Sequence, residues 1–108
     1  MTPTLLDGYP DRVGRRFIWA GDGAGPKSYS QTTGDVVSLP GYQNYVDSVD
    51  GPAISLSGNY WVIPRTTTKG ARANVTLHWY TAGGFTEVSN ATDLSGETVR
   101  LSGKGGTF

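Results

Sequence analysis

The sequence of 108 residues has no cysteine, one histidine, no net charge and no long apolar segment. Without cysteine the chain can form no disulfide, no thiolate metal site and no cysteine nucleophile. Nine acidic and nine basic residues leave no net field that would attract a nucleic acid or an anionic membrane. The longest apolar runs, at 17–20 and 60–63, fall far below the roughly 18 residues of a membrane-spanning helix. The polar N-terminus lacks the core of a signal peptide, and we expect a soluble protein that binds neither membranes nor nucleic acid.

The single histidine, His78, does not indicate a catalytic site. A general base needs a nucleophile and an orienting carboxylate close by, and no residue near His78 in the sequence supplies them. Asp22, Asp47 and Asp50 could contribute to a calcium site, but the helix-flanked loop that ends in glutamate is missing. We therefore expect no enzyme activity, no cofactor and no bound metal.

Glycine and proline are abundant where helices would otherwise form. Sixteen glycines and six prolines interrupt every segment that could nucleate a helix of ordinary length. The sequence therefore predicts an all-β fold, a single small jelly-roll-like sandwich or barrel of about seven or eight short strands with extended termini. The expected strands lie at 15–19, 35–39, 42–49, 59–63, 74–81, 85–89 and 97–101.

Composition divides the chain into an extended N-terminal arm at 1–14, a β-domain at 15–102 and a flexible C-terminal tail at 103–108. The arm has two prolines, two glycines and too few apolar residues to form part of a core. We expect its apolar residues to anchor it on a neighbouring subunit instead.

The aromatic residues exceed what one small core can enclose. Adjacent rings occur at Tyr60 and Trp61 and at Trp79 and Tyr80, and neighbouring residues of a strand point to opposite faces. Alternation predicts a dry face for Trp79 and a wet face for Tyr80 and His78. Tyr, Trp and Arg are enriched in protein–protein contacts, although two leaflets of a sandwich core could also hold many of these rings. The residues expected to contact a partner are Leu5, Leu6, Tyr9, Tyr29, Tyr42, Tyr45, Trp61 and Tyr80.

Several segments resemble a known family. Gly25-Pro26 with Ser28-Tyr29, then Thr33-Gly34-Asp35, an aromatic hairpin and the late segment LSGETVRL are similar to small β-rich decoration or cement proteins of tailed bacteriophages, over roughly 21–101. The resemblance implies a virion structural protein on the capsid exterior, made in the host cytoplasm, that binds the major capsid protein lattice and stabilises the head. It implies a homodimer or homotrimer and no catalytic residue. The loop at 21–45 would then supply a docking surface.

Two other classes of function remain open. A phage tail or head–tail connector protein would share the small β-domain and differ in the symmetry of its assembly. A carbohydrate-binding or single-stranded nucleic-acid-binding β-module would use exposed rings, at Trp61, Trp79 or Tyr80, as stacking platforms. The zero net charge disfavours nucleic acid, since only 65–72 approaches a cationic track.

Overall fold

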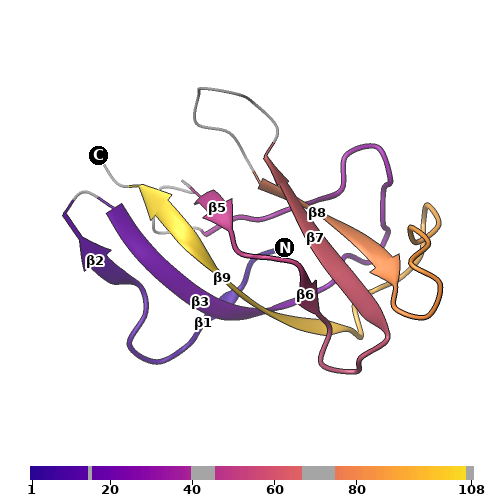
Figure 1. Cartoon of the computed structure of the whole chain (residues 1–108), viewed down its shortest axis with the longest axis horizontal. Helices are drawn as coiled ribbons and strands as arrows, with labels where there is room; N and C mark the ends of the chain where they lie inside the picture. Colours follow the sequence, from indigo (N-terminus) through magenta and orange to yellow (C-terminus); the bar gives the residue numbers. More distant parts are fainter. Residues whose placement is uncertain (15, 40–45, 67–74, 107–108) are drawn as a thin grey trace.

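A computed structural model describes residues 1–14, 16–39, 46–66 and 75–106 of the chain. These residues form nine strands and no helix, arranged as two antiparallel sheets (Figure 1). The first sheet contains β1 (Thr4–Leu5), β2 (Asp11–Val13), β3 (Arg16–Ala24), β9 (Thr98–Gly106) and β5 (Val46–Val49). The second sheet contains, in order, β4 (Asp35–Val36), β8 (Val75–Thr81), β7 (Tyr60–Thr66) and β6 (Ala53–Ile54). The predicted all-β class is confirmed, and no membrane-spanning helix occurs in the described ranges.

One face of each sheet lines a single apolar core. In β3 the side chains alternate, so that Phe17 and Trp19 are buried whereas Ile18 is exposed. In β8 the same alternation directs Leu77 and Trp79 into the core, where neither has any exposed surface. The dry face predicted for this strand is therefore confirmed.

The N-terminal segment lies on the first sheet. The backbone of β1 pairs with β3, and Leu5 packs against the core. The α-ammonium of Met1 donates hydrogen bonds to the Asp35 carboxylate at 2.8 Å and to a backbone carbonyl at 2.6 Å. The close approach requires glycine in β3, since a Cβ at Gly21 would lie 2.7 Å from the Thr4 carbonyl oxygen. The expectation of an extended arm is wrong, because backbone pairing holds the segment without many apolar side chains.

The glycine-rich C-terminal segment is also part of the first sheet. β9 pairs with β3 along its whole length and with β5 on its other side, which makes it a central strand. Gly103, Gly105 and Gly106 are buried. The expectation of a flexible tail is therefore wrong for 103–106, where glycine lets neighbouring backbones come close. Residues 107–108 lie outside the described chain.

The loop expected at 21–45 is only partly a loop. Its first residues belong to β3 and a later pair forms β4. Between them, the backbone N–H of Tyr29 donates to the Thr92 carbonyl oxygen at 3.0 Å, which ties the segment to the chain after β8. The described part of this loop is thus held by the protein itself. Residues 40–45, with the expected contact residues Tyr42 and Tyr45, lie outside the described ranges.

Candidate interaction surface

The outer face of the second sheet, turned away from the core, carries a group of apolar side chains. In the register of β7 and β8, Val62 opposes Trp79 on the core face and Trp61 opposes Tyr80 on the outer face. Ile54 of β6 lies beside Trp61. Val62 and Trp79 are fully buried, whereas Trp61 and Tyr80 are partly exposed. The predicted separation of adjacent rings onto opposite faces is confirmed.

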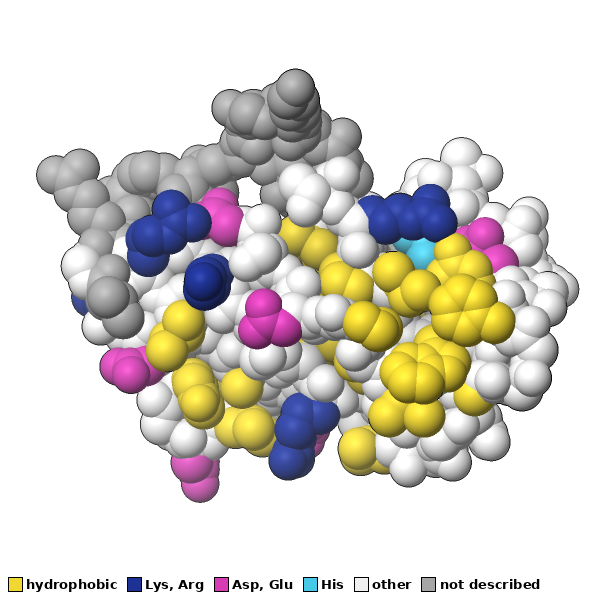
Figure 2. Space-filling view, viewed as in Figure 1, with side chains coloured by type: hydrophobic (Ala, Val, Ile, Leu, Met, Phe, Trp, Pro, Cys, Tyr) yellow, Lys and Arg dark blue, Asp and Glu magenta, His cyan; other side chains and the backbone are white. Residues whose placement is uncertain are grey.

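We name this surface the aromatic face, and it consists of Ile54, Trp61, Ile63, Tyr80 and Phe85. Figure 2 shows a broad apolar area over β6, β7 and β8, bordered by the histidine and a basic side chain. Its most exposed members are Ile54 and Phe85, at 46% and 56% of their surface. Contiguous exposed apolar patches on small soluble domains commonly mark contact sites. The aromatic face is therefore the candidate site of this molecule.

Phe85 reaches this face from a turn rather than from the strand expected at 85–89. Its φ of 50° lies in the left-handed region, which bulky residues rarely adopt and which costs about 1 kcal/mol. Its backbone N–H donates to the Thr81 carbonyl oxygen at 2.9 Å. Its ring stacks on Tyr80 with centroids 5.0 Å apart and planes 10° apart. The fold thus carries a small backbone strain at the position that exposes this ring.

Arg65 and Tyr80 cover the outer side of His78. Arg65 pairs with Thr76 in the register of β7 and β8. Thr76 lies four residues before Tyr80, which is about 13 Å along the strand. Arg65 Nη2 nevertheless donates a hydrogen bond to the Tyr80 hydroxyl at 2.9 Å, so the two side chains lean toward each other. His78, between Thr76 and Tyr80 on the same face, is only 5% exposed. The wet face predicted for this strand is therefore largely covered.

Glu87 and Tyr29 form a hydrogen-bonded cluster with His78. His78 Nδ1 and Glu87 Oε2 lie 3.0 Å apart, and the Tyr29 hydroxyl donates to the same oxygen at 2.8 Å. The expectation that no carboxylate lies near His78 is wrong, because the turn after β8 returns Glu87 to the edge of that strand.

Tyr29 is a core residue and not the surface contact that the sequence predicted. Its side chain is 2% exposed, and its hydroxyl accepts the backbone N–H of Trp79 at 3.0 Å. The carbonyl oxygen of Trp79 accepts the backbone N–H of Val88. The Tyr29 hydroxyl therefore supplies the acceptor that a neighbouring strand would otherwise provide to β8.

The cluster changes the acidity of two of its members. The hydrogen bond with His78 is the main cause that holds the pKa of Glu87 below its usual value; burial opposes it, while Tyr29 and the charges of His78 and Arg65 assist. Burial is the main cause that raises the pKa of the Tyr29 hydroxyl far above its usual value. At neutral pH Tyr29 is therefore a protonated hydrogen-bond donor, and Glu87 is the charged acceptor.

We expect the stability of the protein to fall in acid partly through Glu87. Because the pKa of Glu87 is lower in the folded than in the unfolded chain, its contribution is present above the ordinary value of 4.5 and is lost as pH falls through the lowered value. In Glu87→Gln the free energy of unfolding should be lower at neutral pH and should decline less between about pH 5 and about pH 3. Urea unfolding at several pH values measures how the free energy of unfolding of each protein changes with pH. The same change with pH in the wild type and in Glu87→Gln would contradict this expectation.

Replacing Tyr29 by phenylalanine is expected to lower the free energy of unfolding by about 1–3 kcal/mol. The ring would still fill its site, but the buried N–H of Trp79 would lose its acceptor and Glu87 would lose a donor. The matched control is Tyr9→Phe, since Tyr9 is 41% exposed and its loss of a hydroxyl should change stability by less than about 0.5 kcal/mol. Equal effects of the two changes, measured by thermal denaturation, would disprove the role given to the Tyr29 hydroxyl.

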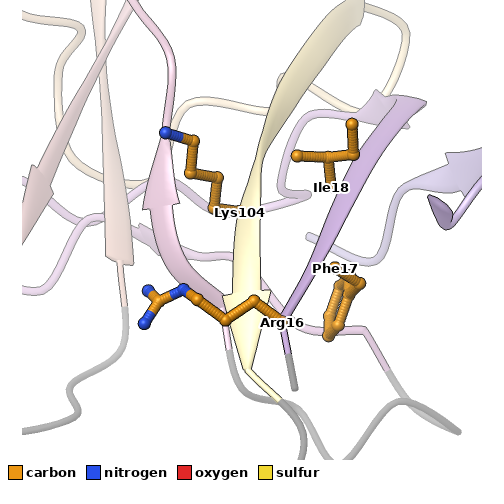
Figure 3. Close-up of a pocket in the computed structure, with 4 residues that line it drawn as sticks. All are labelled: Arg16, Phe17, Ile18 and Lys104. Carbon is orange, nitrogen blue, oxygen red and sulfur yellow. The ribbon is translucent and has the colours of Figure 1, made fainter. Parts of the chain in front are cut away.

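A shallow pocket of about 240 Å³ lies at one end of the first sheet and is lined by Arg16, Phe17, Ile18 and Lys104. Figure 3 shows Phe17 directed away from Arg16. Arg16 Nη2 lies 2.7 Å from the Asp47 carboxylate, so its charge is already paired. The pocket holds no acid–base pair of its own, and it is a weaker candidate than the aromatic face. Among the residues that the structure describes, no group of three His, Asp or Glu side chains could hold a metal ion.

No protein-family model, no curated protein and no solved structure matches this chain. Only its own sequence and geometry therefore bear on its function.

The structure brings two of the predicted contact residues together and separates the others. Trp61 and Tyr80 lie on the aromatic face. Leu5 and Leu6 are half-buried, with Leu5 packed against the core, and Tyr9 lies in the turn before β2 of the other sheet. These three positions do not contribute to the aromatic face.

The contact residues predicted from the sequence do not include Ile54, Ile63, Phe85 or Arg65, which are members or neighbours of this surface. The period of two in β7 could have identified Ile63 and Arg65, since both share the face of Trp61. Nothing in the sequence pattern indicates the left-handed turn that directs Phe85 onto Tyr80.

Proposed function

We propose that the protein is a non-catalytic structural module that attaches to another protein through its aromatic face. The observation that carries this proposal is the row of apolar side chains that the chain leaves partly exposed on the outer face of β6, β7 and β8. Aromatic side chains provide large contact areas at low conformational cost, and they dominate the energetics of many interfaces. The strained backbone at Phe85 supports a role for its ring beyond folding.

The partner that we propose is the major capsid protein of a tailed bacteriophage, with this chain as a decoration protein on the outside of the head. The resemblance of the motifs around Tyr29 and Asp35 supports this assignment. Both residues are buried, so the motifs have a role in the fold, and the contact surface lies elsewhere. A jelly-roll-like arrangement of the two sheets and a homodimeric or homotrimeric state belong to the same proposal.

The test is binding to heads that lack this chain, assembled from the major capsid protein encoded in the same genome. Occupancy after sedimentation should show saturable binding. Phe85→Asn should reduce the affinity by about thirtyfold, the loss typical of a hot-spot residue. The free energy of unfolding should change by less than about 1 kcal/mol. Asparagine tolerates a positive φ, so relief of the backbone strain at this position offsets the loss of ring stacking on Tyr80. The control is Ile18→Ser, since Ile18 is an exposed apolar residue of the other sheet.

Each outcome bears on a different part of the proposal. If the wild-type protein does not bind heads but binds purified tails, its partner is the tail or connector and not the capsid. If Phe85→Asn binds heads as tightly as the wild type and Ile18→Ser binds more weakly, the contact surface lies on the first sheet. Equal binding by all three proteins would remove both surfaces from consideration.

A further inference from the structure

We propose that the partner surface places a carboxylate against Arg65, next to an apolar side chain that covers the rings of the aromatic face. This inference rests on the proposed docking through that face, and it names the chemistry that the partner must present.

The charge of Arg65 supports this proposal. Arg16 and Arg100 form ion pairs with Asp47 and Asp22 at 2.7 and 2.8 Å. For Arg65, no carboxylate lies within ion-pair distance among the residues at 1–14, 16–39, 46–66 and 75–106. An exposed arginine without a carboxylate next to an apolar surface is complementary to an anionic group on a partner.

Glu87 does not take the place of that carboxylate. It lies near enough for the charge of Arg65 to lower its pKa, but its own hydrogen bonds go to His78 at 3.0 Å and to Tyr29 at 2.8 Å. These two contacts hold the carboxylate of Glu87 in the cluster, and the guanidinium of Arg65 forms neither an ion pair nor a hydrogen bond with it.

A hydrogen bond within the protein orients Arg65 before any partner binds. One nitrogen of its guanidinium donates to the Tyr80 hydroxyl at 2.9 Å, and the Tyr80 ring is in turn stacked on Phe85. A guanidinium has five N–H donors in a rigid plane, so the remaining donors can bind both oxygens of a carboxylate. Prior ordering of a long side chain lowers the entropic cost of binding. Nearby rings exclude water on docking, which strengthens the ion pair.

A protein carboxylate fits this surface better than a nucleic acid or a sugar. Binding to a phosphate backbone requires several cations along a track. Among the described residues of β6, β7 and β8, Arg65 is the only lysine or arginine, and it lies beside apolar side chains. A neutral sugar would use the rings for stacking and would gain little from an unpaired positive charge. The charge and the rings together favour an acidic side chain with an apolar neighbour.

The experiment uses two small probes, 2-naphthoate and its uncharged analogue 2-naphthamide, titrated into isotopically labelled protein and followed by NMR. The readouts are the Trp61 indole N–H and the Arg65 Nε–H signals. We expect 2-naphthoate to shift both signals with saturation and to bind about fivefold more tightly than 2-naphthamide, the upper part of the range for a solvent-exposed ion pair. In Arg65→Gln the two probes should bind equally, while an unchanged amide spectrum elsewhere shows that the fold is kept.

Four results would overturn the inference. They are equal affinity of the two probes for the wild-type protein, an unchanged preference in Arg65→Gln, no shift of either signal, and larger shifts of the same signals with a neutral disaccharide.

Binding to heads separates this inference from the proposed function. Arg65→Gln should weaken attachment to heads by about thirtyfold, as expected when one partner of a docked ion pair is removed. Attachment that depends on Phe85 and not on Arg65 would leave the docking in place and reject the carboxylate. Selective binding of 2-naphthoate by a protein that leaves heads bare would keep the carboxylate and reject the capsid as partner.

Discussion

Replacing Trp79 by alanine is expected to lower the free energy of unfolding by about 3–5 kcal/mol, as large truncations in a packed core do. The side chain has no exposed surface, and its ring and the Tyr60 ring pack edge-to-face with centroids 6.0 Å apart. It also opposes Val62 across the strand pair, so its removal opens a cavity between the sheets. Urea unfolding followed by circular dichroism measures the loss.

Two other variants show whether this effect comes from burial. The indole nitrogen of Trp79 is buried without a hydrogen-bond partner, so Trp79→Phe loses volume but removes an unsatisfied donor and should cost much less than alanine. Trp61→Ala removes a ring from the aromatic face and should cost less than about half as much as Trp79→Ala. If Trp61→Ala destabilises the isolated protein as much as Trp79→Ala does, the aromatic face is part of the folding core and not a docking surface.

The features that could be predicted from sequence are those that depend on local alternation. The pattern from Val75 to Trp79 predicts which side of that strand meets the core, because successive side chains of a strand point to opposite faces. The same rule separated Trp61 from its buried neighbour Val62. These predictions needed no knowledge of which strands pair.

The features that could not be predicted depend on distant segments. His78 is buried because Tyr29, 49 positions away in the sequence, and Glu87 meet on its face of the sheet. Arg65 joins them through Tyr80. No pattern within one strand contains this information, since pairing of the strands and the turn at Phe85 decide it.

The role of glycine in this chain is the other feature that could not be predicted from the sequence. Near both ends of the chain it suggested flexible segments, yet at Gly21 and Gly103 it permits close contact between paired backbones. Composition alone does not distinguish a glycine that loosens a chain from one that lets two strands approach. The distinction needs the neighbouring atoms, and it leads to a direct test at the centre of the first sheet.

Replacing Gly103 by alanine is expected to lower the free energy of unfolding by about 3 kcal/mol or more, the upper part of the range for overpacking. A Cβ at this position would collide with the carbonyl oxygen of Ser48 and would lie 3.1 Å from the Cα of Val49. Both are backbone atoms of β5, so relief of the collision requires the shift of a strand.

The control is Gly83→Ala, where a Cβ would meet no atom within 4 Å. Alanine makes the unfolded chain less flexible, so this change should leave the free energy of unfolding unchanged or raise it by up to about 1 kcal/mol. Thermal denaturation of both variants decides the matter: a melting temperature for Gly103→Ala that matches Gly83→Ala would mean that residues 103–106 form the flexible tail suggested by composition and not a central strand.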